Sequence, residues 1–237
     1  MDVNVTEKFI TDGARMIADV WDKEYRGGRY AGESPVGFAG EVLAELARRP
    51  EIQHSRGLYV GCGNGRNYLK LAGADLDVIG LDVSAAGLEQ IASKEPSLAH
   101  KLVQCDFLNY DNGMFGYIVA IQSFQHGDAA RTAEYFRRAA AMLDAGGLLF
   151  VRVNAADTDV GHPHRITERS GGGFTVLYEG GPKSGLHVHF FSRGELEAAV
   201  TGSGLRMTRP PRMVTTKRPG GAPGSWSQWE MVAAREG

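Results

Sequence analysis

The chain contains little cysteine, no long apolar run and no excess of charge of one sign. Its 237 residues include two cysteines, too few for a disulfide framework, and this favours a reduced, cytoplasmic setting. No uncharged apolar stretch approaches the ~20 residues that a membrane helix needs, and the opening "MDVNVTEKFITDGARM" is too polar for a signal peptide. We therefore expect a soluble, cytoplasmic protein without a membrane partner.

The charge balance bears on the class of substrate. The formal net charge is −2, and the lysines and arginines are scattered rather than grouped in a run. No positive field therefore draws the protein to nucleic acid, so nucleic-acid substrates are disfavoured. Hydrophobic residues make up 43% of the chain and charged residues 23%, as in ordinary globular proteins, and the oligomeric state is left open.

Short apolar stretches alternate with helix-forming ones between residues 57 and 155. Strands that are apolar on both faces and separated by helices predict a parallel sheet covered on both sides. Right-handed crossovers then bring the carboxyl ends of the strands to one edge, where open α/β sheets bind ligands. We expect strands over 57–62, 77–82, 101–106, 115–122 and 148–155, and helices over 66–72, 84–95 and 128–144.

The flanking segments complete the predicted fold. Apolar spacing predicts helices over 5–20 and 36–49, a β-hairpin over 171–191, and a helix over 192–202 that precedes two C-terminal strands. We expect a single α/β domain over 1–237, a Rossmann-like three-layer sandwich. Its mostly parallel, seven-stranded sheet ends in an antiparallel C-terminal hairpin. The expected parts are an N-terminal helical cap (1–50), a cofactor-binding core (55–154), a β-hairpin lid insert (155–190) and a C-terminal helix and hairpin (191–237).

Three alternating glycines follow the first strand of the core, in "LYVGCGNGRNYLKLA". They permit positive φ and bring bare backbone against a ligand. Arg66 occupies the place of the third glycine of a dinucleotide fingerprint, where it would crowd a pyrophosphate. Asp82 ends the next strand, and its carboxylate can accept hydrogen bonds from both hydroxyls of a ribose. Each signal alone also occurs in α/β folds without a ligand, but together at this spacing they favour an adenosine ligand.

Over residues 55–155 the sequence resembles the class I S-adenosylmethionine-dependent methyltransferases. "VGCGNGR", "VIGLDVS", "VQCDFLNY", "FGYIVAIQSFQHGD" and "LDAGGLLFV" are similar to five motifs of that family, in the family's order. The segments "WDKEYRGGRY" and "FFSRGEL" are closest to small-molecule methyltransferases of the tellurite-resistance and thiopurine type. The resemblance implies S-adenosyl-L-methionine as cofactor and a small molecule as methyl acceptor.

The resemblance also implies roles for single residues. The N-terminal aromatic loop of such proteins folds over the cofactor, so Trp21, Tyr25 and Tyr30 are candidates for contact with the methionine end; the alternative is that they only fix the first helix to the core. The cofactor-binding residues that we assign are Tyr30, the turn residues Gly61, Cys62, Gly63, Arg66 and Asn67, the ribose ligand Asp82 with Val83 along the adenine, Asp106 and Phe107 at the adenine amine, and Gln122 near the sulfonium.

Methyl transfer from a sulfonium is an in-line displacement, so the enzyme mainly holds acceptor, methyl group and sulfur collinear. A hydroxyl acceptor also needs a base. His126, in "SFQHGD", is the candidate catalytic base because it follows the fourth strand and its ordinary pKa suits neutral pH. The alternative is that His126 only packs beside the next helix.

Two H-x-H pairs lie in or beside the lid insert, His162 with His164 and His187 with His189. Alternate residues of a strand share one face, which is also the geometry of metal ligands. Because no acidic cluster accompanies the pairs, we expect no metal site. These histidines are expected to line a lid over the acceptor or to face solvent.

We expect a methyltransferase that acts on an N, O or S atom of a small molecule, in secondary metabolism or detoxification. The alternative is a nucleic-acid or protein methyltransferase, but "IQSFQH" lacks the Pro-Pro-aromatic run typical of amino methyltransferases of bases. An NAD(P)-dependent oxidoreductase is disfavoured by Arg66 and Asp106. A silent binding scaffold would have no use for the glycine turn and Asp82.

Overall fold

The computed structural model describes residues 6–7, 12–218 and 224–237. It divides into two compact units, Met1–Val119 and Ala120–Gly237, with the boundary inside strand β5. Each unit is described by itself below. The single domain expected from the sequence stays a prediction.

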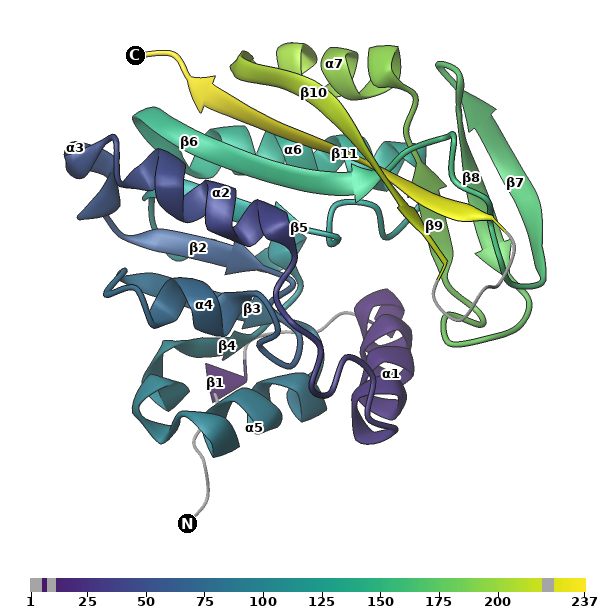
Figure 1. Ribbon diagram of the computed structural model, residues 1–237, viewed down its shortest axis with the longest axis horizontal. Coiled ribbons are helices and arrows are strands. Elements are labelled where there is room, and N and C mark those ends of the chain that lie inside the picture. Colours follow the sequence, from purple (N-terminus) through teal and green to yellow (C-terminus); the bar gives the residue numbers. More distant parts are fainter. Residues whose placement is uncertain (1–5, 8–11, 219–223) are drawn as a thin grey trace. The chain divides into compact units, whose positions relative to one another are not determined.

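The first unit contains five parallel strands in the order β1-β4-β3-β2-β5 (Figure 1). Leu58 pairs with Ile79 on one side and with Ile118 on the other. The strands are Thr6–Glu7 (β1), Gly57–Val60 (β2), Val78–Asp82 (β3), Leu102–Gln104 (β4) and Phe115–Ile121 (β5). The α-helices are Asp12–Arg26 (α1), Gly37–Leu46 (α2), Pro50–Gln53 (α3), Tyr68–Ala72 (α4) and Ala85–Lys94 (α5), and the 3₁₀ turns are Pro96–Lys101 (η1) and Phe107–Asn109 (η2).

The apolar runs explain why these strands lie in the interior. Every residue of β2 and of β5 is buried, as expected for strands covered on both faces. Gly57 admits the ring of Tyr117, since a Cβ at Gly57 would lie 2.1 Å from that ring. Parallel pairing brings the carboxyl ends of β2, β3 and β4 to one edge, and the chain leaves these ends at Gly61, Val83 and Cys105.

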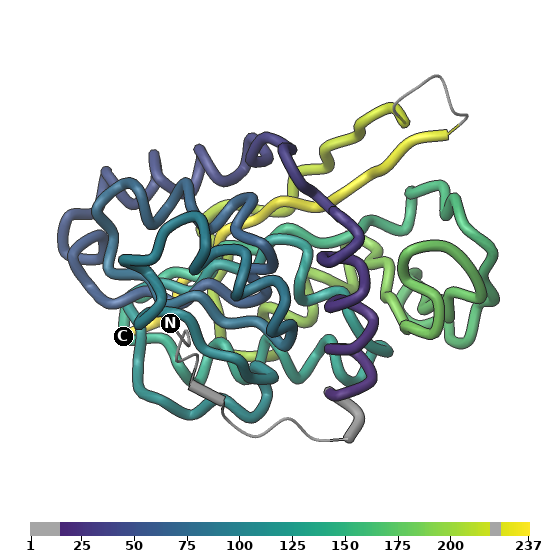
Figure 2. The backbone as a smooth tube through the Cα atoms, turned by 90° about the horizontal axis from the view of Figure 1, so that it is seen from below, coloured from purple at the N-terminus to yellow at the C-terminus, as the bar shows by residue number. Residues whose placement is uncertain are grey.

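The second unit contains the antiparallel strands β6 (Leu143–Asn154), β11 (Ser225–Arg235) and β10 (Leu205–Lys217). Figure 1 shows α6 (Ala129–Met142) and α7 (Arg193–Gly202) along them. Figure 2 shows β10 and β11 running side by side, as their register requires. The predicted end of α6 was late by two residues, because β6 begins at Leu143 and includes the two glycines that we expected to close the helix.

The predicted hairpin lid is wrong in its strand number. The insert and the residues after it form a three-stranded antiparallel sheet, β7 (His164–Ser170), β8 (Gly173–Tyr178) and β9 (His187–Phe190). Strand β7 escaped detection because "HRITERS" is polar and mostly exposed, and so lacks an apolar alternation. The core of this sheet consists of Val176, Tyr178, Val188 and Phe190.

The predicted N-terminal helix is also displaced. It was expected over 5–20, whereas α1 runs over Asp12–Arg26, and Thr6–Glu7 pairs with β4. Residues 1–5 and 8–11, which the prediction partly covered, lie outside the described residues. The helix therefore includes the first part of the segment that we read as an aromatic loop.

The fold class is confirmed as α/β, with a mostly parallel sheet and antiparallel C-terminal strands. The two sets described above contain eight strands among the described residues, one more than expected, and the extra one is the two-residue β1. Within the described part of the chain, no helix is long and apolar enough to span a bilayer.

Candidate cofactor site

The glycine turn is a left-handed bend at the end of β2. Gly61, Gly63 and Gly65 have φ values of 71°, 56° and 88°, which strain residues with a side chain. The N–H groups of Gly61 and Cys62 both donate to the Leu81 carbonyl, at 2.8 and 3.0 Å. The bend is thereby fixed to the end of β3 by main-chain hydrogen bonds.

Asp82 connects the bend to the next helix. One carboxylate oxygen accepts from the Gly63 N–H at 2.7 Å, and the other accepts from the Ser84 N–H at 2.9 Å. The side chain is buried, with 8% of the residue exposed. Each carboxylate oxygen has a second lone-pair site, so Asp82 can accept further hydrogen bonds from a ligand.

The environment of Asp82 changes its acidity. Burial raises the pKa of Asp82 to about 6, against the opposing effect of the N–H groups of Ser84, Gly63 and Val83. At neutral pH the carboxylate is therefore mostly ionised, but it titrates close to the physiological range. A buried, ionised carboxylate that only accepts hydrogen bonds suits hydroxyl donors such as those of a ribose.

Tyr25 of α1 covers the bend. A Cβ at Gly63 would lie 2.4 Å from the Tyr25 hydroxyl oxygen, and a Cβ at Gly87 would lie 3.1 Å from the Tyr25 ring. Burial, with Asp82 nearby, raises the pKa of Tyr25 well above its usual value, so the hydroxyl keeps its proton. We expected the bare backbone of Gly63 to face the cofactor; in this structure it faces the Tyr25 hydroxyl.

Asp22, one turn before Tyr25, holds α1 against α5 (Figure 1). Its carboxylate accepts from the Ser84 hydroxyl at 2.5 Å and from the Ala86 N–H at 3.1 Å. Ser84 is itself the N-cap of α5 and accepts from the Gly87 N–H at 3.0 Å. Two acceptors thus satisfy the first N–H groups of α5, and α1 supplies one of them.

The segment after α1 is joined to the turn by side chains. Asn64 donates to the Arg29 carbonyl at 3.0 Å, and Asn67 accepts from the Val36 N–H at 2.9 Å. Arg66 forms an ion pair with Glu33 at 2.8 Å. The sequence between α1 and α2 is therefore a strap across the residues that follow β2.

The predicted cofactor residue Tyr30 lies in this strap, at φ 60°. Its ring is 4.2 Å from the Arg66 guanidinium and 4.7 Å from that of Arg29, both within cation–π range. Of the three aromatic candidates, Tyr25 is the one that contacts the glycine bend; its own stacking partner is Trp21, at 5.6 Å between ring centroids. The predicted helix end at residue 20 concealed Tyr25, because its position on the helix face that carries Asp22 was not visible.

The predicted adenine-binding residues lie at the carboxyl end of β4. Asp106 is buried and caps the η2 turn by accepting from the Leu108 N–H at 3.1 Å. Phe107, also buried, is the first residue of that turn. The Val83 carbonyl accepts from the Gln104 side chain at 3.1 Å, and Cys62 is a free, buried cysteine. The structure therefore brings the residues assigned from 61 to 107 to the edge formed by β2, β3 and β4.

Gln122 and His126 belong to the second unit. Gln122 has a φ of 61° directly after β5, and its N–H donates to the Arg152 carbonyl at 2.7 Å. Burial, and then the charge of Lys183, lowers the pKa of His126 to about 3. The imidazole is therefore neutral at pH 7, and its affinity for a proton is low for a general base. Its assignment as the catalytic base stays a prediction.

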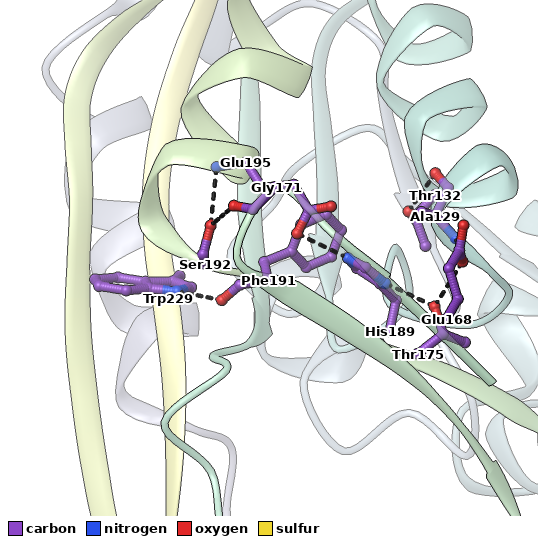
Figure 3. A network of polar contacts seen from close by, with 10 residues as sticks. All are labelled: Ala129, Thr132, Glu168, Gly171, Thr175, His189, Phe191, Ser192, Glu195 and Trp229. Carbon is purple, nitrogen blue, oxygen red and sulfur yellow. Dashed lines mark hydrogen bonds and ion pairs between the residues drawn. The ribbon is translucent and has the colours of Figure 1, made fainter. Parts of the chain in front are cut away.

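The four paired histidines have different surroundings. His162 and His164 lie beside the Tyr178 ring, at 6.4 and 6.5 Å between centroids, and His187 is exposed. His189 is fully buried, between the Thr175 hydroxyl at 2.9 Å and Glu195 at 3.0 Å (Figure 3). Among the described residues, no group of three or more His, Cys, Asp or Glu side chains gathers as metal ligands do.

His189 fixes the small sheet to the helices of the second unit. Thr175 also donates to Glu168 at 3.0 Å, and Glu168 accepts from the Ala129 N–H at the start of α6 at 3.0 Å (Figure 3). Glu195 belongs to α7. The insert is therefore attached at both α6 and α7, and His189 has a structural role between them.

The comparisons with known proteins agree with this architecture. Residues 58–147 match the family described as a methyltransferase domain. This stretch is a methyltransferase domain. It contains the glycine bend, Asp82 and Asp106, and the predicted resemblance is confirmed for it. Over 80 residues the chain is also 31% identical to a probable thiol methyltransferase 2 of Arabidopsis thaliana, a match that covers 33% of this chain and 34% of that protein. The matched part is thus about a third of that relative's length.

Solved structures show the same fold over nearly the whole chain. The magnesium protoporphyrin IX methyltransferase of Synechocystis PCC 6803, with bound SAM, has a TM-score of 0.65 at 14% identity and covers 97% of this chain and 100% of its own. The 1,6-didemethyltoxoflavin-N1-methyltransferase of Burkholderia thailandensis, with bound 1,6-didemethyltoxoflavin and S-adenosylhomocysteine, has a TM-score of 0.64 at 16% identity, with coverages of 97% and 93%. At these identities the similarity shows the fold.

Proposed function

We propose that the protein is an S-adenosyl-L-methionine-dependent methyltransferase that acts on a small molecule in secondary metabolism or detoxification. The observation that carries the proposal is the hydrogen bond between the Asp82 carboxylate and the Gly63 N–H, within a stretch that matches a methyltransferase domain. Neighbours of this fold are crystallised with SAM or S-adenosylhomocysteine. Their titles name a porphyrin and a toxoflavin precursor as substrates, both small molecules.

The residues present fit such a cofactor. The bend at Gly61 and Gly63 presents backbone without side chains, and Asp82 has lone-pair sites left for ribose hydroxyls. Asp106 is a buried carboxylate at the next strand end, where an exocyclic amine would find an acceptor. Tyr25 adds a protonated hydroxyl that has no hydrogen-bond partner in the described parts of the chain, and it would hold the ligand from the side of α1.

When bound, the cofactor supplies an electrophilic methyl group on a sulfonium. The chain's own residues contribute orientation: Asp82 and the bend fix the nucleoside, while α1 and its strap exclude water from the bend. Nothing in this arrangement needs a strong base if the acceptor is an amine or a thiolate. The weakly basic His126 favours acceptors of that kind over an unactivated hydroxyl. The free, buried cysteines support a reduced, cytoplasmic setting.

Calorimetric titration with S-adenosylmethionine and S-adenosylhomocysteine tests the proposal. We expect both to bind, and Asp82→Ala to weaken binding at least ~100-fold through loss of two charge-assisted hydrogen bonds. Asp111→Ala is the matched control, since Asp111 is an exposed aspartate of the same unit. Absence of binding by the wild-type protein, or full affinity in Asp82→Ala, would overturn the assignment.

A further inference from the structure

A chain of buried polar side chains crosses β6 and β11 in the second unit. Arg152 and Asn154 lie opposite Glu230 and Gln228, so each pair faces its partner across the two strands. All four residues are at most 8% exposed. Arg152 donates to Gln228 at 2.6 Å and forms an ion pair with Glu230 at 3.1 Å.

This chain fixes which end of each carboxamide points where. The Arg152 guanidinium can only donate, so Gln228 must accept through its oxygen and present its NH₂ group to Asn154. Gln228 then donates to the Asn154 oxygen at 3.3 Å. The Asn154 carboxamide is therefore oriented with its NH₂ group at the other end.

Gln125 is oriented in the same way from a different element. Its side-chain oxygen accepts from the main-chain N–H of Asn154 at 2.8 Å, and a main-chain N–H can only donate. The Gln125 carbonyl accepts from the His189 N–H at 2.8 Å, which fixes its backbone. The NH₂ group of Gln125 is thus the spare end of a second pre-oriented carboxamide.

Neither NH₂ group is satisfied within the protein. No hydrogen bond from Gln125 Nε2 or Asn154 Nδ2 reaches an acceptor in residues 12–218 or 224–237. The two residues are 2% and 8% exposed, and nearly buried donors are normally paired. Asn154 ends β6 and Gln125 follows β5 by four residues, and the carboxyl ends of strands are where open α/β sheets bind ligands.

We propose that the NH₂ groups of Gln125 and Asn154 form a binding site for the methyl acceptor, and that this acceptor presents a carbonyl, carboxylate or phenolate oxygen or an aromatic ring nitrogen. The proposal rests on the proposed function. Both groups only donate, so the site selects molecules that accept hydrogen bonds and rejects ammonium groups. The buried Arg152–Gln228 contact makes Gln228 and Arg152 positioning residues for Asn154.

Isosteric variants isolate the spare ends. Asn154→Asp keeps an oxygen for Gln228, and Gln125→Glu keeps an oxygen for the Asn154 N–H, so each change replaces only the unsatisfied NH₂ group by an acceptor. Asn112→Asp, at an exposed asparagine of the other unit, makes the same change of charge and is the control. Each variant also removes one pair of side-chain NH₂ resonances and so assigns it in the ¹H–¹⁵N spectrum.

The test is a titration of ¹⁵N-labelled protein with benzoate and, separately, with benzylammonium. We expect benzoate to shift the NH₂ resonances of both residues and benzylammonium to shift neither. In Asn154→Asp and in Gln125→Glu, benzoate affinity should fall at least tenfold, whereas Asn112→Asp should leave it unchanged. The site is refuted if benzoate leaves both NH₂ pairs in place, or if Asn112→Asp weakens benzoate as much as the other variants.

Calorimetry with S-adenosylhomocysteine on the same variants separates this proposal from the function. Retained binding in Asn154→Asp and Gln125→Glu shows that the cofactor site is intact. If wild-type protein binds benzoate at the two NH₂ groups but fails to bind S-adenosylhomocysteine, the donor site stands and the methyltransferase assignment fails. If only S-adenosylhomocysteine binds, the donor site fails and the assignment stands.

Discussion

The glycine bend of the first unit and the polar cluster of the second are both ordered sites, but they are built from different parts of the chain. The bend is held by main-chain N–H groups that donate to Leu81 and Asp82, with little side chain between them. The cluster around Arg152 and Glu230 is held by side chains that pair across strands. The first site should therefore fail when atoms are added, and the second when atoms or charges are removed.

The largest effect is expected at Glu230. This carboxylate is 2% exposed and pairs with Arg152 at 3.1 Å and with Arg212 at 2.7 Å. Glu230→Gln leaves the buried Arg152 without a counter-charge, and removal of one partner of a buried pair costs about 3–5 kcal/mol. Urea unfolding measures the change. Arg212→Gln is the control, because Arg212 is half exposed and its loss should cost less than ~1 kcal/mol; equal losses in the two variants would contradict this account.

Addition of one methyl group should damage the bend. Gly63→Ala places a side chain at φ 56° and puts its Cβ 2.4 Å from the Tyr25 hydroxyl oxygen. The conformational and packing terms together predict a loss of about 2–4 kcal/mol in the free energy of unfolding, and weaker S-adenosylhomocysteine binding. Combination with Tyr25→Phe should recover only the part due to the hydroxyl. Complete recovery would mean that the left-handed backbone contributes nothing.

Two histidines of one strand give a matched pair. His189 is buried between Thr175 and Glu195, whereas His187 is exposed. His189→Gln leaves buried polar partners poorly satisfied and should lower the free energy of unfolding by about 1–3 kcal/mol. His187→Gln should change it by less than ~0.5 kcal/mol. If the two variants are equally stable in thermal and urea unfolding, the network in Figure 3 does not stabilise the second unit.

The acidity of Asp82 predicts a pH dependence of cofactor binding. Its pKa is raised to about 6, so the ionised, accepting form is lost as the pH falls below 6, and the Kd for S-adenosylhomocysteine should then rise by at most ~tenfold per pH unit. Since the folded-state pKa lies above the ordinary 3.8, the folded state binds more protons between these values and the free energy of unfolding decreases as the pH rises from 3.8 to 6.

Calorimetry between pH 5 and 7.5 measures this slope. Asp82→Asn should flatten it, because the only group proposed to titrate against the ligand in that range is then absent. His126, with a pKa of about 3, does not titrate there, and His126→Gln should leave the slope as it is. A slope that survives in Asp82→Asn and disappears in His126→Gln would reverse the assignment.

The smallest effect is expected at the contact between α1 and α5. Asp22→Ala removes the acceptor for the Ser84 hydroxyl and the Ala86 N–H, and loss of an N-terminal helix cap costs about 1 kcal/mol. Asp19, on the same helix, offers the control Asp19→Ala. Thermal unfolding should separate the two variants by a few degrees; indistinguishable midpoints would show that α1 does not depend on this cap.

Local patterns made the first site predictable. The bend, Asp82 and Asp106 lie at the ends of apolar strands, and their spacing along the chain reports their position at one edge of the sheet. Tyr25 was not assigned because it depends on where α1 ends, and helix ends are poorly defined by apolar spacing. The donors Gln125 and Asn154 could not be found at all, because their orientation depends on Gln228, 74 residues away from Asn154 on a paired strand. The polar strand β7 was missed for the related reason that its partner, not its own composition, makes it a strand.

Asp22 and Tyr25 lie three residues apart on α1, one bonded to the start of α5 and the other against Gly63. Any opening of α1 therefore uncaps α5 and uncovers the bend in a single event. A ligand held against Tyr25 would make that opening rarer by mass action, so amide exchange in α1 should slow in proportion to ligand occupancy. The amino-terminal helix would then report a filled site to any observer of its backbone protons.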